Sequence, residues 1–316
     1  MKYIILTLVS LYFLTSCEQV FIPAVPEEER IIIEGHIESG PEALPPYVIL
    51  SRSLPYFGVV QPEDIVNNQI TDAQVEVIFE GSAYELEHFC ISDLPPELIE
   101  GLLGEADVNF ILDSTDFCLY IDWQNSIPIQ VGGKYDLNIQ LANGEQLTGT
   151  TTIPNLVPLD SFEFTPPPGN PEADTLARLL SYLSDPADEV NFYRYLTASN
   201  EGPFIAGFGS VVDDALFNGQ TFQFPLQKAI DPQANEELDD DFETETFGLY
   251  NRGDTIRIKW MNLDEEHFNF WNSFEFNLNN QGPFSTYTRV SSNVDGALGV
   301  WGGYSSDIYT LVVPTQ

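Results

Sequence analysis

Residues 135–148 read YDLNIQLANGEQLT, and this stretch carries the clearest sequence signal for the fold. Asn143-Gly144 separates one strand-like segment, which ends at Leu141, from a second that begins at Gln146. An Asn-Gly pair between two such segments is a strong signal for a two-residue β-hairpin, because both residues tolerate the positive φ angles of that turn. The sequence therefore predicts two antiparallel strands here.

Short strand-like segments bounded by turn residues occur on both sides of this hairpin. We expect further strands at residues 31–37, 47–53, 74–80, 83–89, 117–123, 160–165, 190–198, 255–261 and 308–313. Short strands at close spacing, with few helices between them, are typical of antiparallel sheets packed in layers. The expected fold class is therefore mainly β, with two β-sandwich or barrel-like antiparallel domains and one or two short helices.

A domain boundary is expected where Pro154 and Pro158 flank a short apolar connector. This boundary gives an N-terminal immunoglobulin-like β-sandwich over residues 31–157 and a C-terminal β-rich domain over residues 158–316. In the second domain we expect one or two helical turns at residues 175–184. Residues 291–304 contain four glycines, which predicts tight turns and close approach of the backbone to a neighbouring segment before the last strand.

Residues 264–280 are compatible with two kinds of secondary structure. Phe268, Phe270 and Phe274 alternate as in a strand, whereas His267, Trp271, Phe274 and Leu278 share one helical face. Asn262 followed by Glu265 offers the capping chemistry of a helix N-terminus. We expect a helix whose aromatic residues pack in the core.

The first 17 residues have the organisation of an export signal. Lys2 supplies a positive charge, residues 4–14 are mostly apolar, and Leu14-Thr15-Ser16-Cys17 closes the segment. The apolar run is too short to span a bilayer. Leu-Thr-Ser-Cys resembles the bacterial lipobox, which implies that residues 1–16 are a lipoprotein signal peptide and that Cys17 is acylated after cleavage, with fatty acids such as palmitate. An ordinary signal peptide with an incidental cysteine is the alternative.

Residues 17–30 contain Pro23, Pro26 and several glutamates, as expected of an acidic tether that holds the folded part away from the membrane. The whole chain of 316 residues has a formal net charge of −38. So acidic a surface repels phosphate backbones, which argues against a nucleic-acid partner. It also repels anionic lipids, so attachment to the membrane should come from the lipid anchor.

Two cysteines remain if Cys17 is acylated. In an exported protein, Cys90 and Cys118 are expected to form one disulfide, worth roughly 3 kcal/mol in the chain-entropy model. Two free buried thiols are the alternative. The loop between the cysteines is expected to hold one short helix within residues 94–112.

Motifs that carry catalytic chemistry are missing from the sequence. It contains no Gly-x-Ser-x-Gly elbow, His-Glu-x-x-His pair, phosphate loop or dinucleotide fingerprint. The acidic residues around Asp264 are better explained by a helix N-terminus, and those at 239–245 by a solvated loop, than by a metal site. We therefore expect a non-enzymatic protein without metal or cofactor. A pair of catalytic carboxylates of the kind found in glycosidases remains an alternative.

Aromatic residues beside glycines are the candidates for ligand binding, because glycine leaves a neighbouring ring uncovered. They are Tyr56, Phe57, Trp301 and Tyr304. Packing of these rings in the core or in loops is favoured over ligand binding at each position.

Several sequence blocks occur together in an order that resembles one family, catalogued as domain of unknown function 4249. Besides the lipobox, the blocks are residues 32–35, 47–51, 70–75, 133–137, 152–154, 268–274 and 293–303. The resemblance implies an outer-membrane lipoprotein of the Bacteroidota, on the periplasmic side or at the cell surface. Members are often encoded beside TonB-dependent transporters, which implies an accessory role in nutrient uptake, by binding a ligand or docking on the transporter. An envelope adhesin or structural lipoprotein without a transport role is the alternative.

Overall fold

The structure is a computed structural model that describes residues 29–54, 61–93, 117–169, 174–229, 247–280 and 288–315. Several predicted features lie outside these residues: the expected signal peptide, Cys17, most of the expected tether, Tyr56, Phe57, the expected helix within 94–112 and the acidic stretch 239–245. Among the residues described, no helix has the length and apolar character needed to cross a membrane.

The described part of the chain is mainly β, as expected, and its strands pair mostly in antiparallel fashion. The N-terminal half contains β1 (Ile31–Ser39), β2 (Tyr47–Arg52), α2 (Pro62–Asn67), β3 (Gln74–Phe79), β4 (Ser82–Cys90), a 3₁₀ turn (Ile91–Asp93), β5 (Cys118–Ile121), β6 (Lys134–Gln140) and β7 (Gln146–Thr152). The C-terminal half contains β8 (Leu159–Thr165), β9 (Leu176–Ser184), β10 (Phe192–Ser199), β11 (Ile205–Asp213), β12 (Thr221–Pro225), β13 (Tyr250–Asn251), β14 (Thr255–Leu263), α5 (Glu265–Asn279), β15 (Val294–Asp295) and β16 (Leu298–Val312).

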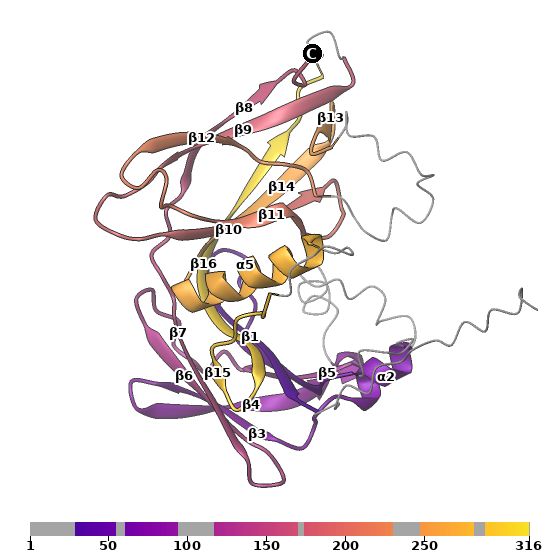
Figure 1. Cartoon of the computed structure of the whole chain (residues 1–316), viewed down its shortest axis with the longest axis vertical. Helices are drawn as coiled ribbons and strands as arrows, with labels where there is room; N and C mark the ends of the chain where they lie inside the picture. Colours follow the sequence, from indigo (N-terminus) through magenta and orange to yellow (C-terminus); the bar gives the residue numbers. More distant parts are fainter. Residues whose placement is uncertain are drawn as a thin grey trace, which may run out of the picture.

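One long sheet runs through both halves of the molecule (Figure 1). It has twelve strands in the order β11-β10-β14-β16-β1-β2-β5-β4-β3-β6-β7-β15, and a separate four-stranded sheet contains β8, β9, β12 and β13. β16 joins the halves, because it pairs antiparallel with β14 and parallel with β1. The parallel pair departs from the antiparallel expectation. It arises because β16 reaches β1 from the far end of the chain rather than through a hairpin.

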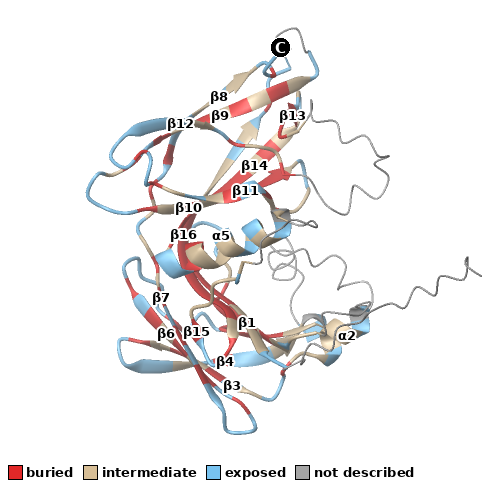
Figure 2. Cartoon of the chain, in the orientation of Figure 1, coloured by how far each residue is buried: buried red, intermediate tan, exposed pale blue. Residues whose placement is uncertain are grey.

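Each half has its own hydrophobic core, and the two cores meet along β16. The first contains Val75, Leu137 and Ile139, together with Trp301 from β16. The second contains residues of β9, β10 and β14. Buried residues mark β1, β16 and β14 in Figure 2. The chain leaves the first core near residue 157 and returns to it at residues 294–301, so a boundary at 157/158 does not separate the halves completely.

The prediction of helical turns at residues 175–184 is wrong. This segment is β9, in which Ala177, Leu179, Ser181 and Leu183 are buried at alternate positions. Its leucines, alanine and arginine favour a helix in isolation, but pairing with β8 and β12 on either side determines the strand.

The prediction of turns over residues 291–304 is correct only around Gly296, which has φ 85°. Most of the segment is strand, in β15 and the first half of β16. Gly299 has φ 122°, and a Cβ there would lie 1.8 Å from the carbonyl oxygen of Ile33. The glycine is therefore needed for close approach of β1 rather than for a turn.

The hairpin at Asn143-Gly144 is confirmed, with a different turn. Gly144 N–H donates to the Leu141 carbonyl, and Leu141 N–H donates to the Glu145 carbonyl (both 2.9 Å). Gly144 has φ 87°. The connection is thus a turn followed by a glycine in the left-handed conformation. This is a longer hairpin loop than the two-residue turn that we expected.

The helix at residues 264–280 is confirmed as α5. Its N-cap is Asp264, whose carboxylate accepts a hydrogen bond from His267 N–H (2.7 Å), and not Asn262. Phe268 is buried as expected, whereas Phe274, Phe276 and Leu278 are exposed. Only the N-terminal part of the aromatic stripe therefore belongs to the core.

Candidate functional site

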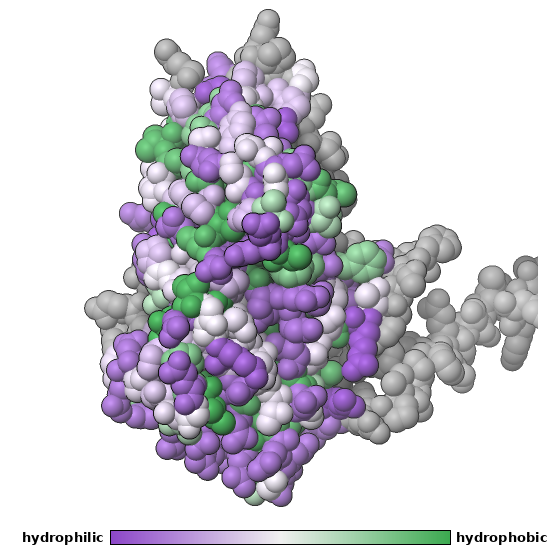
Figure 3. Space-filling view, turned by 90° about the vertical axis from the view of Figure 1, so that its left-hand side faces the viewer, coloured by the Kyte–Doolittle hydropathy of each residue, from purple (hydrophilic) through white to green (hydrophobic). Residues whose placement is uncertain are grey.

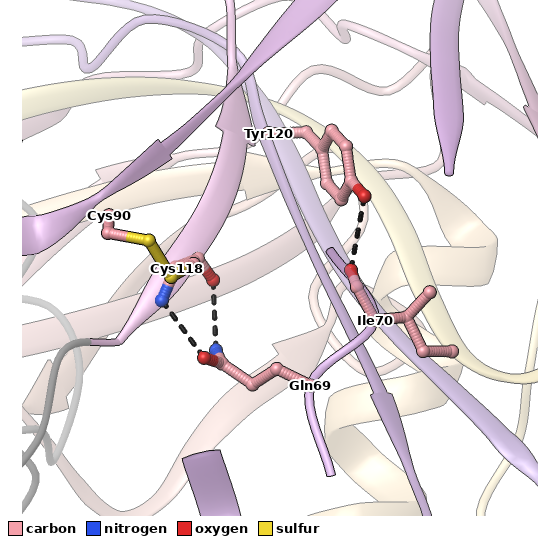
Figure 4. Close-up of a disulfide and its surroundings, with 5 residues drawn as sticks. All are labelled: Gln69, Ile70, Cys90, Cys118 and Tyr120. Carbon is pink, nitrogen blue, oxygen red and sulfur yellow. Dashed lines mark hydrogen bonds between the residues drawn. A yellow bond between two sulfur atoms is a disulfide. The ribbon is translucent and has the colours of Figure 1, made fainter. Parts of the chain in front are cut away.

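The Cys90–Cys118 disulfide is present and confirms the expected pairing. The two cysteines lie directly opposite each other on β4 and β5, with Cα atoms 3.9 Å apart. Gln69 binds Cys118 from the other side, because its amide accepts from Cys118 N–H (3.0 Å) and donates to the Cys118 carbonyl (2.9 Å) (Figure 4). The disulfide therefore lies within a braced strand pair.

A second brace holds β5 to the same segment. The Tyr120 hydroxyl donates to the Ile70 carbonyl (3.1 Å) and accepts from Ala73 N–H (2.9 Å). Ile70 N–H in turn donates to the Leu50 carbonyl on β2 (2.9 Å). These hydrogen bonds hold β5 in place independently of the sulfur–sulfur bond.

As ligand-binding candidates Trp301 and Tyr304 are wrong, because both are buried, and the packing in the core that the sequence favoured is confirmed for both. Trp301 is fully buried in the first core, where its indole N–H donates to the Tyr135 carbonyl (3.1 Å). A Cβ on Gly35 would lie 2.8 Å from the Trp301 ring, so a glycine makes room for the indole. Gly35 on β1 thus admits the Trp301 ring to the interior, whereas the adjacent Gly302 and Gly303 lie against His267 and Thr152.

Tyr304 belongs to a buried polar network across three adjacent strands. Lys259 on β14 binds the Glu38 carboxylate of β1 at 3.0 and 3.1 Å. The Tyr304 hydroxyl (3.0 Å) and the Ser306 hydroxyl, both on β16, also donate to Glu38. A fully hydrogen-bonded ion pair at the centre of the sheet fixes the position of β16 between β1 and β14.

Two histidines far apart in sequence meet beneath α5. The ring centroids of His36 and His267 lie 5.3 Å apart. His267 Nε2 accepts from the Trp271 indole N–H (2.8 Å), so its proton lies on Nδ1, which faces the Gly303 carbonyl at 3.4 Å. Burial, with the neighbouring His36 and Arg194, holds the pKa of His267 well below its usual range. His267 is therefore a neutral structural residue.

Arg194 attaches α5 to the sheet beside this pair. Its guanidinium lies 3.5 Å from the centroid of the Trp271 ring and 3.8 Å from the Glu275 carboxylate. Glu275 accepts from the Ser210 N–H (2.9 Å) and from its hydroxyl. β11 is at the edge of the long sheet, where backbone N–H groups have no partner strand on one side. Glu275 accepts the hydrogen bond of one such group, the Ser210 N–H.

Exposed apolar side chains occur on one side of the C-terminal half, in β12 and in the loops beside it. We define the end patch as Val190, Leu216 and Phe222, whose exposed fractions are 68, 92 and 41 %. Phe222 stacks on the buried Phe217 at a centroid distance of 4.8 Å. Figure 3 views the molecule from the side of these loops, and the upper and middle parts of this face carry more hydrophobic surface than the lower part.

The loops that carry the end patch are held by hydrogen bonds. Asn191 N–H donates to the buried Asp214 carboxylate (2.7 Å), and Asp214 N–H donates to the Asn191 carbonyl (3.1 Å). Asp185 accepts from the Tyr193 hydroxyl and from Gly219 N–H (3.0 Å). The patch is thus presented on a fixed support. Burial, reinforced by Asp185 and Asp213, raises the pKa of Asp214 despite its bond from Asn191.

A family model described as a domain of unknown function (DUF4249) matches residues 18–310. The chain belongs to this family. No curated protein matches it. The match includes strands of both halves and β16 as far as residue 310, so in this DUF4249 chain one family model covers the halves that share the long sheet.

Sequence reasoning missed the polar clusters of this DUF4249 chain. His36 and His267 are separated by most of the chain, and so are Glu38 and Lys259. The pairing of β1 with β16 and of β16 with β14 brings Glu38 to Lys259, and the packing of α5 on β16 brings His267 to His36. Lys259, inside the apolar segment 255–261, could have indicated a buried ion pair, because a buried lysine needs a carboxylate partner.

Proposed function

We propose that this protein is a non-enzymatic outer-membrane lipoprotein, anchored through Cys17, that docks on a TonB-dependent transporter and assists nutrient uptake. The end patch is the observation that carries the docking part of this proposal. Two apolar side chains on fixed loops, together with Phe222 on β12, form a surface of the kind that protein partners cover.

The anchor and the charge of the chain are consistent with this role. The acyl chains on Cys17 would keep the protein at the membrane, where a transporter is within reach. With a net charge of −38, the chain would associate faster with a partner that has basic groups around its binding surface.

The proposal is tested by purifying the acylated chain from detergent-solubilised outer membrane and identifying retained proteins by mass spectrometry. We expect a TonB-dependent transporter with the wild type, and its loss with Leu216→Asp. Val312→Asp is the matched control, because Val312 is a similarly exposed apolar residue outside the end patch. If Leu216→Asp and Val312→Asp retain the transporter equally well, the end patch is not the docking surface.

Two further measurements separate the proposal from its alternative. The Cys17→Ala variant should be recovered in the soluble fraction if Cys17 carries the anchor. Deletion of the protein should slow uptake through the retained transporter. Unchanged uptake, with loss of attachment to surfaces or of envelope integrity, would instead identify an adhesin or a structural lipoprotein.

A further inference from the structure

The disulfide has a third potential metal ligand beside it. His88 lies two residues before Cys90 on β4, so the two side chains share one face of the strand. Each of His88, Cys90 and Cys118 has a possible ligand atom, and these three atoms lie within 4.8 Å of one another. His88 is exposed and the cysteines are half-buried, so an ion can reach the site from solvent.

We propose that His88, Cys90 and Cys118 bind one thiophilic divalent cation, of which Zn²⁺ is the representative, when the disulfide is reduced. Two thiolates and one imidazole form a donor set typical of zinc, with the fourth position left to water. The disulfide and the metal ion are then alternative states of one site.

The surrounding hydrogen bonds keep the three ligands in place after reduction. Gln69 retains both of its bonds to the Cys118 backbone, and Tyr120 keeps β5 attached to residues 70–73. His88 pairs with Tyr120 across the strands, and its ring lies against the Tyr120 ring at a centroid distance of 5.3 Å. The site is therefore built on a strand pair that hydrogen bonds hold in addition to the sulfur–sulfur bond.

A dithiol is the reductant that converts the disulfide to the two thiols of the metal site. Two electrons and two protons pass from the dithiol to the Cys90 and Cys118 sulfurs, the sulfur–sulfur bond breaks, and the dithiol leaves as its own disulfide. Binding of Zn²⁺ then releases the two thiol protons to solvent, because the metal takes thiolates as ligands. In the reverse reaction the oxidised dithiol, itself a disulfide, takes two electrons and two protons back as the Cys90–Cys118 bond re-forms, and the ion leaves.

The test compares metal binding by the oxidised and the reduced chain under anaerobic conditions. Co²⁺ serves as a spectroscopic probe, and Zn²⁺ affinity is measured by competition with a chromogenic chelator. We expect one ion per reduced chain with thiolate-to-cobalt charge-transfer absorption, and no such absorption from the oxidised chain. His88→Gln should weaken Zn²⁺ binding by the reduced chain at least about tenfold.

Glu85→Gln is the matched control, since it removes an exposed carboxylate from the opposite face of β4; it should bind Zn²⁺ like the wild type. If the reduced chain unfolds without metal, Zn²⁺ should restore its circular dichroism spectrum and raise its melting temperature. The proposal is overturned if reduction adds no Zn²⁺ binding, if Zn²⁺ fails to restore an unfolded reduced chain, or if His88→Gln binds as tightly as the wild type. Each result would leave a purely structural disulfide.

Discussion

Glu38 and Lys259 are 221 positions apart and form an ion pair in which both side chains are almost completely buried, at 2 and 1 % exposure. The pair lies on β1 and β14, the two strands on either side of β16. It therefore joins the halves of the molecule at the strand that they share. Because the charges have no access to water, each depends on the other.

Lys259→Met should lower the free energy of unfolding by about 3–5 kcal/mol, because it leaves the Glu38 carboxylate buried without its counter-charge. Urea unfolding measures this loss. Lys134→Met is the control: Lys134 and Asp136 form an exposed pair at 3.2 Å, whose loss should cost less than about 1 kcal/mol. The double variant Glu38→Leu with Lys259→Met should lose less than the sum of its single variants. Additive losses would show that the two residues do not depend on each other.

Gly302→Ala should destabilise the attachment of α5 to β16. A Cβ at this position would lie 2.6 Å from three atoms of the His267 ring, so the ring or the helix must move, at a cost of about 1–3 kcal/mol. Thermal unfolding measures the cost. In a His267→Ala background the same substitution should be much less harmful, because the clashing ring has gone. An equal cost in both backgrounds would place the strain elsewhere.

Stability should decrease as the pH falls below about 6.5, the ordinary histidine value, because the pKa of His267 is lowered in the folded state. The unfolded chain then binds a proton that the folded chain does not, so the free energy of unfolding rises with pH until His267 is neutral in both states. Protonation of Nε2 would also oppose the Trp271 N–H. Urea unfolding from pH 8 to pH 5 measures the slope.

His267→Gln should flatten this slope, whereas His88→Gln, which removes a histidine outside the cluster, should keep it. Asp264 contributes in the opposite direction at lower pH, because burial raises its pKa although Thr151, His267 and Thr152 donate to it. The effect of His267 on the free energy of unfolding is therefore measured at pH values above the range in which carboxylates titrate. A slope that is the same in the wild type and in His267→Gln would contradict the assignment.

Stability should also decrease above about pH 10, partly through Tyr309. Burial raises the pKa of its hydroxyl to about 12, although the bond from Leu159 N–H opposes this shift. Between pH 10 and 12 the unfolded chain loses a proton that the folded chain retains, so the free energy of unfolding falls as the pH rises. Tyr309→Phe should be about 1 kcal/mol less stable at pH 8, because Leu159 N–H loses its acceptor. It should also show a shallower alkaline decrease in urea unfolding. If the variant loses stability above pH 10 as steeply as the wild type, the loss is due to other tyrosines.

Most local elements follow from local sequence. Period-two strands such as β3 and β6, the hairpin at Gly144 and the capped helix α5 are determined by side chains within a few residues of one another. The same holds for the resemblance of residues 14–17 to a lipobox, which depends on adjacent residues. β9 is the exception, because its residues favour a helix locally and become a strand only between β8 and β12.

The sequence by itself determined the β class, the family, the candidate anchor at Cys17 and the pairing of Cys90 with Cys118, since each rests on short-range patterns or on counting. Only the tertiary structure decided that β16 lies between β1 and β14, that Trp301 and Tyr304 are buried, and which charges meet. These features depend on contacts between residues more than 100 positions apart. No local pattern encodes such contacts, because the free energy that selects them comes from burying both partners together.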